Sequence, residues 1–368
     1  MKELRIKDIC DKGSSNLKQK DVEGKNGQYP VYGASGIISH IDTYHQEENY
    51  IAIVKDGSGI GRVTFMPAKS SVIGTMQYIL PKEGFNINYI GYCLQSLDLS
   101  KYKQGAAIPH IYFRDYGERI VKVTEDTKEQ QSIVDYLDSA FAKIDAMKAN
   151  AEKSLNEAKA LFQASLKEML EPKEGWKEKR IDEVCSIARG GSPRPIKAYI
   201  TNDSNGLNWI KIGDTDMGGK YIYSTKEKIK PEGLKKSRWV EEDEFLLSNS
   251  MSFGRPYILK TNGCIHDGWL VLRDYQKYLD IDFFYYVLSS ENVQKQFRIK
   301  AQGSTVSNLN TDRVASVIIY VPTIERQQSI VTTLDSLKSK VDRLQENYDK
   351  ISQECNALKQ AILRQVFE

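Results

Sequence analysis

Hydrophobic side chains in the last part of the sequence recur in alternating steps of four and three residues. The pattern extends over most of 325–368 and is the a/d seam of a coiled coil. Its positions are Ile330, Leu334, Leu337, Val341, Leu344, Tyr348, Ile351, Cys355, Leu358 and Ile362. We therefore predict one long helix over 324–368.

A second segment, 127–171, begins with the same spacing but becomes small and polar in its second half. Its expected seam consists of Ile133, Leu137, Ala140, Ile144, Met147, Ala151, Ser154 and Ala158. Pro172 cannot continue a helix and would end this one. At about 1.5 Å per residue, each helix of roughly 43 residues would be about 65 Å long.

Helix start signals precede both periodic segments. Thr127 with Gln130 fits a capping box, in which two side chains bind free backbone N–H groups of the first turn. Thr323, which follows Pro322, is the expected cap of the second helix.

The chain is internally duplicated. Segments 128–171 and 325–368 align without a gap at an offset of 197, with 19 identities in 44 positions. Shorter similarities relate 5–10 to 180–185 at an offset of 175, and 105–108 to 303–306 at an offset of 198. Because the offset grows by 23 residues, the second globular segment carries net insertions between its ends. Internal repeats of this kind indicate repeated structural units.

We predict an α+β fold of two α/β-mixed globular domains, 1–126 and 172–323, separated by the long helices 127–171 and 324–368. Strands are expected over 50–55 and 62–66 around a glycine-rich turn, and over 209–212, 244–247 and 257–259. Segments 88–94 and 281–288 are expected to be helices. The two long helices should form an intramolecular antiparallel coiled coil with pseudo-two-fold symmetry. The alternative is that each helix packs only on its own domain.

Composition adds limited information. The 368 residues carry a net charge of only +3, with slight basic excess in 1–128 and 172–324, which is compatible with an anionic partner but does not demonstrate one. No apolar run is long enough for a membrane span and the first residues lack a signal-peptide core, so a cytoplasmic location is expected. The five cysteines are far apart and odd in number, and we expect them to be reduced and mostly buried.

Catalytic signatures are missing from the sequence. It has no GxxxxGK[ST], HExxH or GxSxG pattern, and no Asn-Pro-Pro-aromatic or Asp-Pro-Pro-aromatic tetrapeptide. The glycines of 57–61 favour a tight turn over a nucleotide loop, and His40 and His45 are not favoured as metal ligands. We expect no catalytic residue, no metal site and no bound cofactor in this chain.

Several short motifs together resemble one family. They are Gln130-Gln-Ser-Ile-Val134 and its copy Gln327-Gln-Ser-Ile-Val331, Tyr29-Pro-Val-Tyr-Gly33, and the segments 105–111, 209–214 and 263–268. Over essentially its whole length, the chain resembles the specificity subunit of type I DNA restriction-modification enzymes.

The resemblance implies a non-catalytic DNA-binding subunit. Two target recognition domains would each read half of a bipartite, asymmetric site in double-stranded DNA, while the helices set the spacing and dock two modification subunits. Those methyltransferase subunits would carry S-adenosylmethionine, and separate restriction or translocase subunits would cut DNA.

Base reading needs side chains with paired donors and acceptors at a groove, and phosphate binding needs cations or amides. The candidates in the first domain are Lys55, Ser58, Arg62, Lys103, Gln104, His110 and Tyr112. Those in the second are Arg189, Ser192, Arg194, Lys211, Asp214, Ser250, Arg255, Gln302, Ser304 and Asn308. Trp209, Trp239 and Trp269 are expected in core or rim packing. The alternative function is a coiled-coil scaffold that does not bind DNA.

Overall fold

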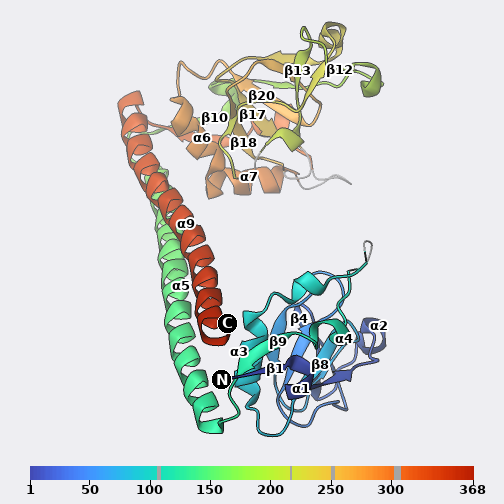
Figure 1. The fold of residues 1–368 in the computed structure, drawn as a ribbon. Helices are drawn as coiled ribbons and strands as arrows, with labels where there is room; N and C mark the ends of the chain where they lie inside the picture. The colour runs from blue at the N-terminus through green and yellow to red at the C-terminus, as the bar shows by residue number, and fades with distance from the viewer. Residues whose placement is uncertain (106–108, 216–217, 250–252, 302–307) are drawn as a thin grey trace. The chain divides into compact units, whose positions relative to one another are not determined.

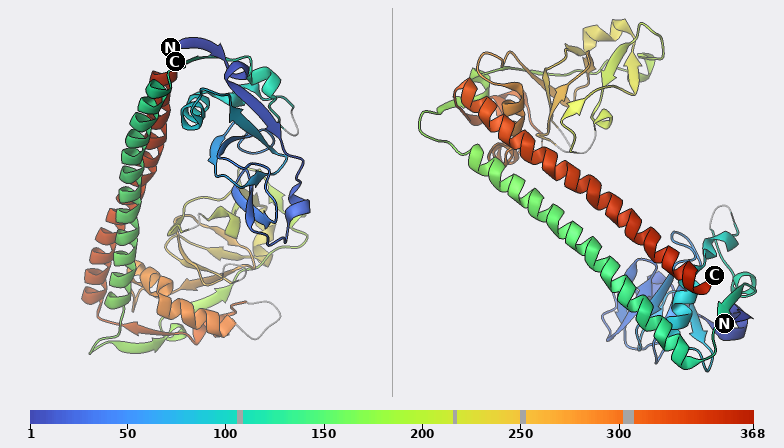
Figure 2. Two further views of the ribbon diagram at one scale, coloured as in Figure 1. Left: turned by 90° about the horizontal axis from the view of Figure 1, so that it is seen from below. Right: turned by 60° about the vertical axis from the view of Figure 1, so that its left-hand side comes forward.

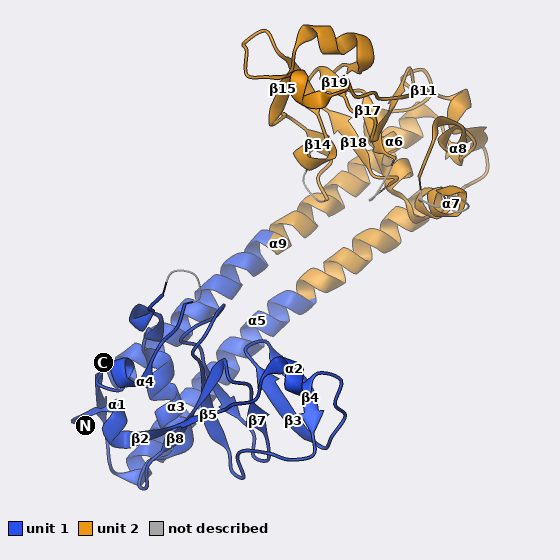
Figure 3. Cartoon of the chain, turned by 90° about the vertical axis from the view of Figure 1, so that its right-hand side faces the viewer, with its two compact units in different colours: residues 1–153, 346–368 blue, residues 154–345 orange. Residues whose placement is uncertain are grey.

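The computed structural model describes residues 1–105, 109–215, 218–249, 253–301 and 308–368. The chain divides into two compact units (Figure 3). Unit 1 comprises Met1–Lys153 and Glu346–Glu368, and unit 2 comprises Ser154–Gln345. The long helices α5 (Thr127–Met169) and α9 (Ile324–Phe367) pass from one unit to the other, so each unit contains a globular part and a piece of both helices (Figure 1). Both predicted helices are confirmed.

Unit 1 contains an antiparallel four-stranded sheet in the order β2-β8-β5-β6. Its central strand β5 is buried at every residue, which suits its continuous apolar sequence. A three-stranded sheet β4-β3-β7 and a two-stranded pair β1-β9 complete the strands. The bounds are β1 Lys2–Arg5, β2 Cys10–Ser14, β3 Tyr29–Gly33, β4 Gly36–Ile41, β5 Tyr50–Val54, β6 Val63–Met66, β7 Ser71–Val72, β8 Met76–Pro81, β9 Ile120–Val123, α1 Ile6–Ile9, α2 Gln19–Val22, α3 Ile87–Ser96, η1 Leu99–Tyr102 and α4 Phe113–Tyr116.

Unit 2 contains two five-stranded sheets, β11-β20-β17-β18-β14 and β12-β15-β13-β19-β16, and the pair β10-β21. Its strands are β10 Lys177–Arg180, β11 Ser186–Arg189, β12 Ile200–Thr201, β13 Leu207–Ile210, β14 Tyr221–Ile222, β15 Glu227–Ile229, β16 Arg238–Val240, β17 Phe245–Ser248, β18 Pro256–Leu259, β19 Gly263–Ile265, β20 Trp269–Arg273 and β21 Ile318–Val321. Its helices are η2 Ile181–Glu183, η3 Ile196–Ala198, η4 Ile212–Asp214, η5 Pro231–Lys236, α6 Ile281–Ser289, α7 Glu291–Ala301 and α8 Thr311–Ala315.

The duplication is visible in the strand pairing. Strand β1 pairs antiparallel with β9 just before α5, and β10 pairs in the same way with β21 just before α9. Helices α3 and α6 occupy equivalent positions in the chain, and each begins at a side-chain cap, Asn86 or Asp280. Unit 2 has a five-stranded second sheet where unit 1 has three strands. The inserted residues therefore enlarge the globular part, as the changing offset predicted.

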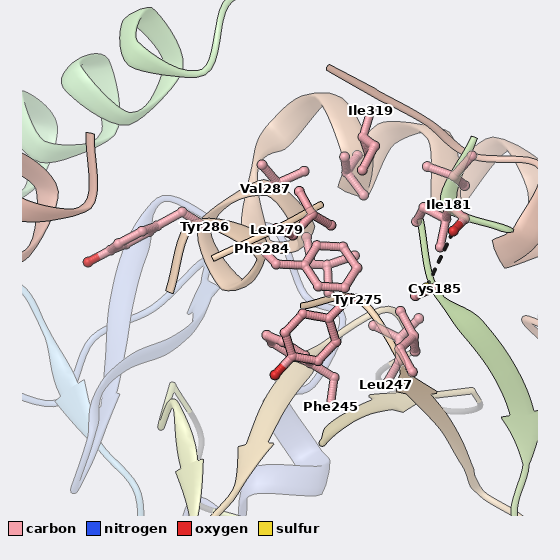
Figure 4. Packing of buried hydrophobic residues seen from close by; sticks show 14 of the residues in the cluster. Ile181, Cys185, Phe245, Leu247, Tyr275, Leu279, Phe284, Tyr286, Val287 and Ile319 are labelled. Carbon is pink, nitrogen blue, oxygen red and sulfur yellow. Dashed lines mark hydrogen bonds between the residues drawn. The ribbon is translucent and has the colours of Figure 1, made fainter. Parts of the chain in front are cut away.

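The main core of unit 2 joins the first sheet to its helices (Figure 4). Phe245 of β17 packs edge-on against Tyr275 and Phe284, with ring centroids 5.2 and 5.0 Å away. Ile330 and Leu334 of α9 belong to the same buried cluster. The corresponding cluster of unit 1 includes Leu363 and Phe367 at the end of α9. Each globular part is thus packed onto the long helices through its own apolar core.

The long helices pair side by side and antiparallel (Figure 2). In unit 1, the Lys359 ammonium of α9 lies 2.7 Å from the Asp145 carboxylate of α5, and the Cys355 thiol lies 3.7 Å from the Ile144 carbonyl oxygen. In unit 2, the Lys159 ammonium of α5 donates to the Gln345 side chain of α9 at 2.8 Å. Later residues of α5 therefore face earlier residues of α9, which confirms the antiparallel coiled coil.

The seam predicted for α5 is wrong at two positions. The other six, Ile133, Leu137, Ala140, Ile144, Ala151 and Ala158, are buried or half-buried. Met147 is 60% exposed and Ser154 is also exposed. The buried or half-buried side of the helix also carries Phe141, Leu155, Phe162, Leu166 and Met169. Ala140 and Phe141 are both half-buried, and steps of seven residues run from Phe141 to Leu155, Phe162 and Met169, because these larger side chains have more apolar surface to bury.

The last turns of α9 also depart from the heptad. Leu358 is 48% exposed, whereas Leu363 and Phe367 are buried. The Phe367 ring lies 5.3 Å from the ring of Tyr89 in α3. This end of α9 therefore packs on the globular part of unit 1, and its buried face follows steps of four residues instead of the two-helix seam.

The predicted capping box at α5 is wrong. The Asp126 carboxylate accepts from the Lys128 backbone N–H at 2.8 Å, so it takes the capping role given to Thr127. Gln130 is fully buried: its Nε2 donates to the carbonyl oxygens of Gly84 and Thr124, both at 3.0 Å, and its Oε1 accepts from the Asn86 N–H at 2.7 Å.

These three side-chain hydrogen bonds of a buried glutamine, here called the amide clamp, recur at Gln327 in α9. Gln327 is fully buried, and its Nε2 donates to the carbonyl oxygens of Tyr278 and Pro322 at 2.9 and 3.0 Å. Its Oε1 accepts from the Asp280 N–H at 2.8 Å. Thr323 accepts from the Arg326 N–H at 3.4 Å, which confirms the cap predicted there.

Two further sequence expectations concern burial and membranes. All five cysteines are free and buried, as predicted. In the part of the chain that the structure describes, no helix is both long and apolar enough to cross a membrane.

Replacing Gln327 by alanine should destabilise the protein, because one buried and two part-buried backbone groups lose their partner. Each unpaired buried group costs about 1–3 kcal/mol, so the free energy of unfolding should fall by at least about 2 kcal/mol in urea melts. The matched control is Gln328→Ala, since Gln328 is exposed on the same turn, and its effect should stay within about 0.5 kcal/mol. Equal midpoints for both variants would contradict the clamp.

Candidate nucleic-acid interface

Two loops of unit 1 are joined by backbone hydrogen bonds. One is the glycine-rich turn between β5 and β6, and the other is the segment between η1 and α4. Gln104 and His110 exchange backbone bonds of 2.8 and 2.9 Å. The Gly57 N–H donates to Pro109 at 3.1 Å, and the Ile111 N–H donates to Lys55 at 3.0 Å. The predicted candidates of unit 1 are therefore brought together on adjoining loops.

Aromatic and basic side chains stack on the second of these loops. His110 contacts the Asp56 carboxylate through Nδ1, and its ring centroid lies 4.0 Å from that of Tyr112. The Arg114 guanidinium lies 4.5 Å from the Tyr112 ring centroid. Tyr112 is 38% exposed, so the stack is open to solvent. Sequence reasoning missed Arg114 and Asp56, although both adjoin residues that it selected.

The other candidates of unit 1 differ in their partners. Gln104 Nε2 donates to the Asp115 carboxylate at 2.8 Å, and the Arg62 guanidinium donates to the Ala34 carbonyl oxygen. Ser58 and Lys103 are exposed, and Lys55 is half-buried. Ser58 and Lys103 are thus open to an anionic ligand, whereas Gln104 and Arg62 would have to exchange a protein partner for it.

In unit 2, three predicted residues meet at a single turn, 266–268. Ser192 donates to the Asp267 carboxylate at 2.7 Å, and the Arg194 guanidinium lies 3.4 Å from the second carboxylate oxygen. Arg189 Nε donates to the Asp267 carbonyl oxygen at 3.2 Å. The Ser192 hydrogen bond lowers the pKa of Asp267, so the carboxylate stays ionised. Sequence reasoning missed Asp267, although segment 263–268 was among the family-like motifs.

Lys211 and Asp214 lie beside the same turn. His266, whose N–H donates to Ile210 at 3.4 Å, has its ring 6.2 Å from that of Trp209. Burial lowers the pKa of His266, which favours the neutral ring. The Lys211 ammonium pairs with Glu227 at 2.6 Å, and Asp214 accepts from the Lys211 N–H at 2.8 Å. Asp214 therefore has a local structural role.

The remaining candidates of unit 2 lie elsewhere. Arg255, at the start of β18, is exposed and lines a pocket with Tyr285 and Gln294. Asn308 has a buried side-chain oxygen for which the described residues supply no hydrogen-bond partner. Ser250, Gln302 and Ser304 lie outside the described residues.

The tryptophans pack as predicted. Trp209 and Trp269 are buried, and Trp239 packs against the Trp209 cluster.

A basic segment was missed altogether. Exposed cations follow one another from β15 to the start of β16, and they are Lys226, Lys230, Lys235, Lys236 and Arg238. Segment 226–238 contains six basic and two acidic residues, so its charge exceeds that of the whole chain. Arg238 Nε donates to the Arg189 carbonyl oxygen at 2.6 Å, which connects this segment to the 266–268 turn. A count of charges in short windows would have found it.

Comparison with known proteins gives concordant matches. A protein of Haemophilus influenzae assigned as a type I restriction enzyme specificity subunit is 22% identical over 340 residues, covering 87% of this chain and 83% of that protein. A chain from a structure of complex assembly and conformational transition in a type I restriction-modification system superposes with a TM-score of 0.74, at 18% identity, over 98% of this chain and 96% of that chain.

The HsdS subunit of Thermoanaerobacter tengcongensis has the same fold, with a TM-score of 0.56 at 16% identity over 98% of this chain and 95% of that chain. Residues 1–157 and 173–353 match the family described as type I restriction modification DNA specificity domain. The match includes most of both repeats, and the chain therefore belongs to this family.

Proposed function

We propose that this chain reads a bipartite DNA target for a type I restriction-modification complex, with one recognition domain on each half-site. The observation that carries the proposal is the duplication itself. Two globular parts are attached to the long helices through the same clamp, yet they present different loops. Different loops read different bases, so the target should be asymmetric.

The chemistry of the two surfaces supports DNA as the partner. Arginine side chains and a stacked aromatic ring can reach base edges and sugars, and exposed lysines neutralise phosphates. Unit 1 offers the His110, Tyr112 and Arg114 stack, and unit 2 offers the 266–268 cluster beside the basic segment 226–238. In unit 2 the basic segment 226–238 can thus bind phosphates, while the neighbouring 266–268 cluster reads bases.

Methyl transfer should be supplied by two modification subunits that bind S-adenosylmethionine, and cleavage by separate restriction or translocase subunits. A docking surface for a modification subunit is available on α5. Tyr136 and Met147 are 56% and 60% exposed. They are eleven residues apart, so about 100° per residue places them on nearly the same face of the helix. We assign these two exposed apolar side chains as contacts of the modification subunit, because a partner on this face would remove both from water.

DNA binding by the assembled complex should depend steeply on salt. Each neutralised phosphate contributes a slope of about −0.9 in a plot of log affinity against log salt, so replacing Lys230 and Lys235 together by glutamine should reduce the slope by up to about two. Fluorescence anisotropy with a labelled target duplex measures this. The control, Lys173→Gln with Lys177→Gln, removes the same charge elsewhere in unit 2. If the complex binds the duplex independently of salt, or does not bind it, the alternative function as a coiled-coil scaffold is favoured.

A charge placed on the apolar face of α5 should block the modification subunit. Met147→Glu should lower its co-purification with this chain at least about tenfold, because an ionised carboxylate in a desolvated interface lacks a partner. The control Ala149→Glu adds the same charge two residues on, about 200° around the helix. Ala149 is exposed, and the control should retain the partner. Equal recovery of the subunit with both variants would refute this surface.

A further inference from the structure

An acidic side chain, Asp267, lies between two arginines on the candidate surface of unit 2. Asp267 has a side chain that is 45% exposed, and Arg189, Arg194 and Ser192 all contact it. A carboxylate near DNA repels phosphates, so its presence within a DNA-reading surface needs a compensating role.

The carboxylate ties the loop after β11 to the turn before β20. Its two oxygens hold Ser192 and Arg194, and its own N–H lies 3.3 Å from the Ser192 hydroxyl oxygen. Backbone bonds run alongside, from Gly190 to Trp269 at 2.9 Å and from Gly191 to Ile265 at 3.2 Å. The two segments thus approach through paired backbone and side-chain contacts.

Glycine is required for this approach. A Cβ on Gly190 would lie 2.2 Å from the His266 carbonyl oxygen, and one on Gly268 would lie 2.1 Å from the His266 ring. A larger residue at Gly190 would displace the backbone of the turn, and one at Gly268 would displace the His266 ring. The sequence therefore provides a close fit around Asp267.

A third loop joins at the same point. Asn249, after β17, is almost fully buried; its N–H donates to Gly268 at 3.0 Å, and its Nδ2 donates to the Asp267 carbonyl oxygen at 2.8 Å. The Leu309 N–H in turn donates to the Asn249 carbonyl oxygen at 2.9 Å. Three chain segments that are distant in sequence therefore converge on one residue.

We propose that Asp267 is a positioning residue for half-site reading: it orients Ser192 and Arg194 toward the bases without contacting DNA itself. This inference rests on the proposed function. A fixed guanidinium loses less conformational freedom when it binds, and correct placement of a bidentate donor determines base discrimination. Removing the carboxylate should thus weaken specific binding.

The sign of the effect separates positioning from simple charge. If Asp267 acted only as a negative charge, Asp267→Asn would strengthen binding to every duplex, because it removes a repulsion. A positioning role predicts weaker binding to the target and unchanged or stronger binding to unrelated DNA. A destabilised fold would instead weaken binding to both.

The test uses the complex of this chain with its modification subunits. Mapping methylated adenines gives the target, and anisotropy then compares four duplexes: the full target, one with each half-site scrambled, and one without the target. Asp267→Asn should weaken binding to the full target about tenfold, a typical loss for one specific base contact. The same loss should persist when one half-site is scrambled and disappear when the other is.

Two further variants complete the design. Ser192→Ala removes the Ser192–Asp267 hydrogen bond from the serine side. The double variant Asp267→Asn with Ser192→Ala should lose less affinity for the target than the product of the two single losses, because both changes act through one contact. The control Glu174→Gln removes the same charge at an exposed position before β10, away from both loops, and should not weaken target binding.

Three results would overturn the inference. One is stronger binding of Asp267→Asn to all duplexes, and another is an equal loss on all four. The third is a wild-type complex that binds the target and the unrelated duplex equally, which would refute the proposed function as well.

Discussion

The buried amide clamp is the constraint on which the rest of the structure depends. Gln130 and Gln327 each fix the first turn of a long helix to a carbonyl oxygen of the preceding strand–helix connection and to the N–H of the residue that caps α3 or α6. Each amide makes three hydrogen bonds with a modest net gain in stability, but removing it leaves one buried and two part-buried backbone groups without that partner. Because losing these bonds costs more than forming them gains, the clamp fixes the direction in which each helix leaves its globular part.

A second repeated contact lies about two turns further along each long helix. The Tyr92 hydroxyl of α3 contacts the Asp138 carboxylate of α5, and the Tyr286 hydroxyl of α6 donates to the Asp335 carboxylate of α9 at 2.5 Å. Burial raises the pKa of both phenols above the usual range, so they remain donors. The duplicated segments thus conserve the geometry of attachment, while the loops that face away from the helices differ between the units.

The features that could be predicted from the sequence are those that follow from local periodicity and from the repeat. Apolar spacing located α5 and α9, and the identity between 128–171 and 325–368 located the repeat. The α5 seam was wrong at Met147 and Ser154, because the adjacent apolar residues Ala140 and Phe141 allow two phases of the heptad and only packing decides between them. Gln130 was read as a capping residue because its partners at Gly84 and Asn86 are distant in sequence. Asp267 was overlooked for the same reason, since its role arises only when three loops meet.

The antiparallel pairing has a direct consequence for spacing. Since α5 and α9 pair along both units, their lengths can change only together, and a heptad added to one helix alone would have to loop out. The long helices are therefore the part of the chain that can set the distance between half-sites, independently of which bases each domain reads.

The most direct measurement inserts one heptad into both helices, between residues 151 and 152 of α5 and between 350 and 351 of α9, and maps methylated adenines in cells carrying this chain. Each insertion adds about 10.5 Å of helix and keeps the seam in phase. The account predicts unchanged half-site sequences separated by up to about three more base pairs, at about 3.4 Å each. An active enzyme with an unaltered spacer, or with altered half-site bases, would contradict it.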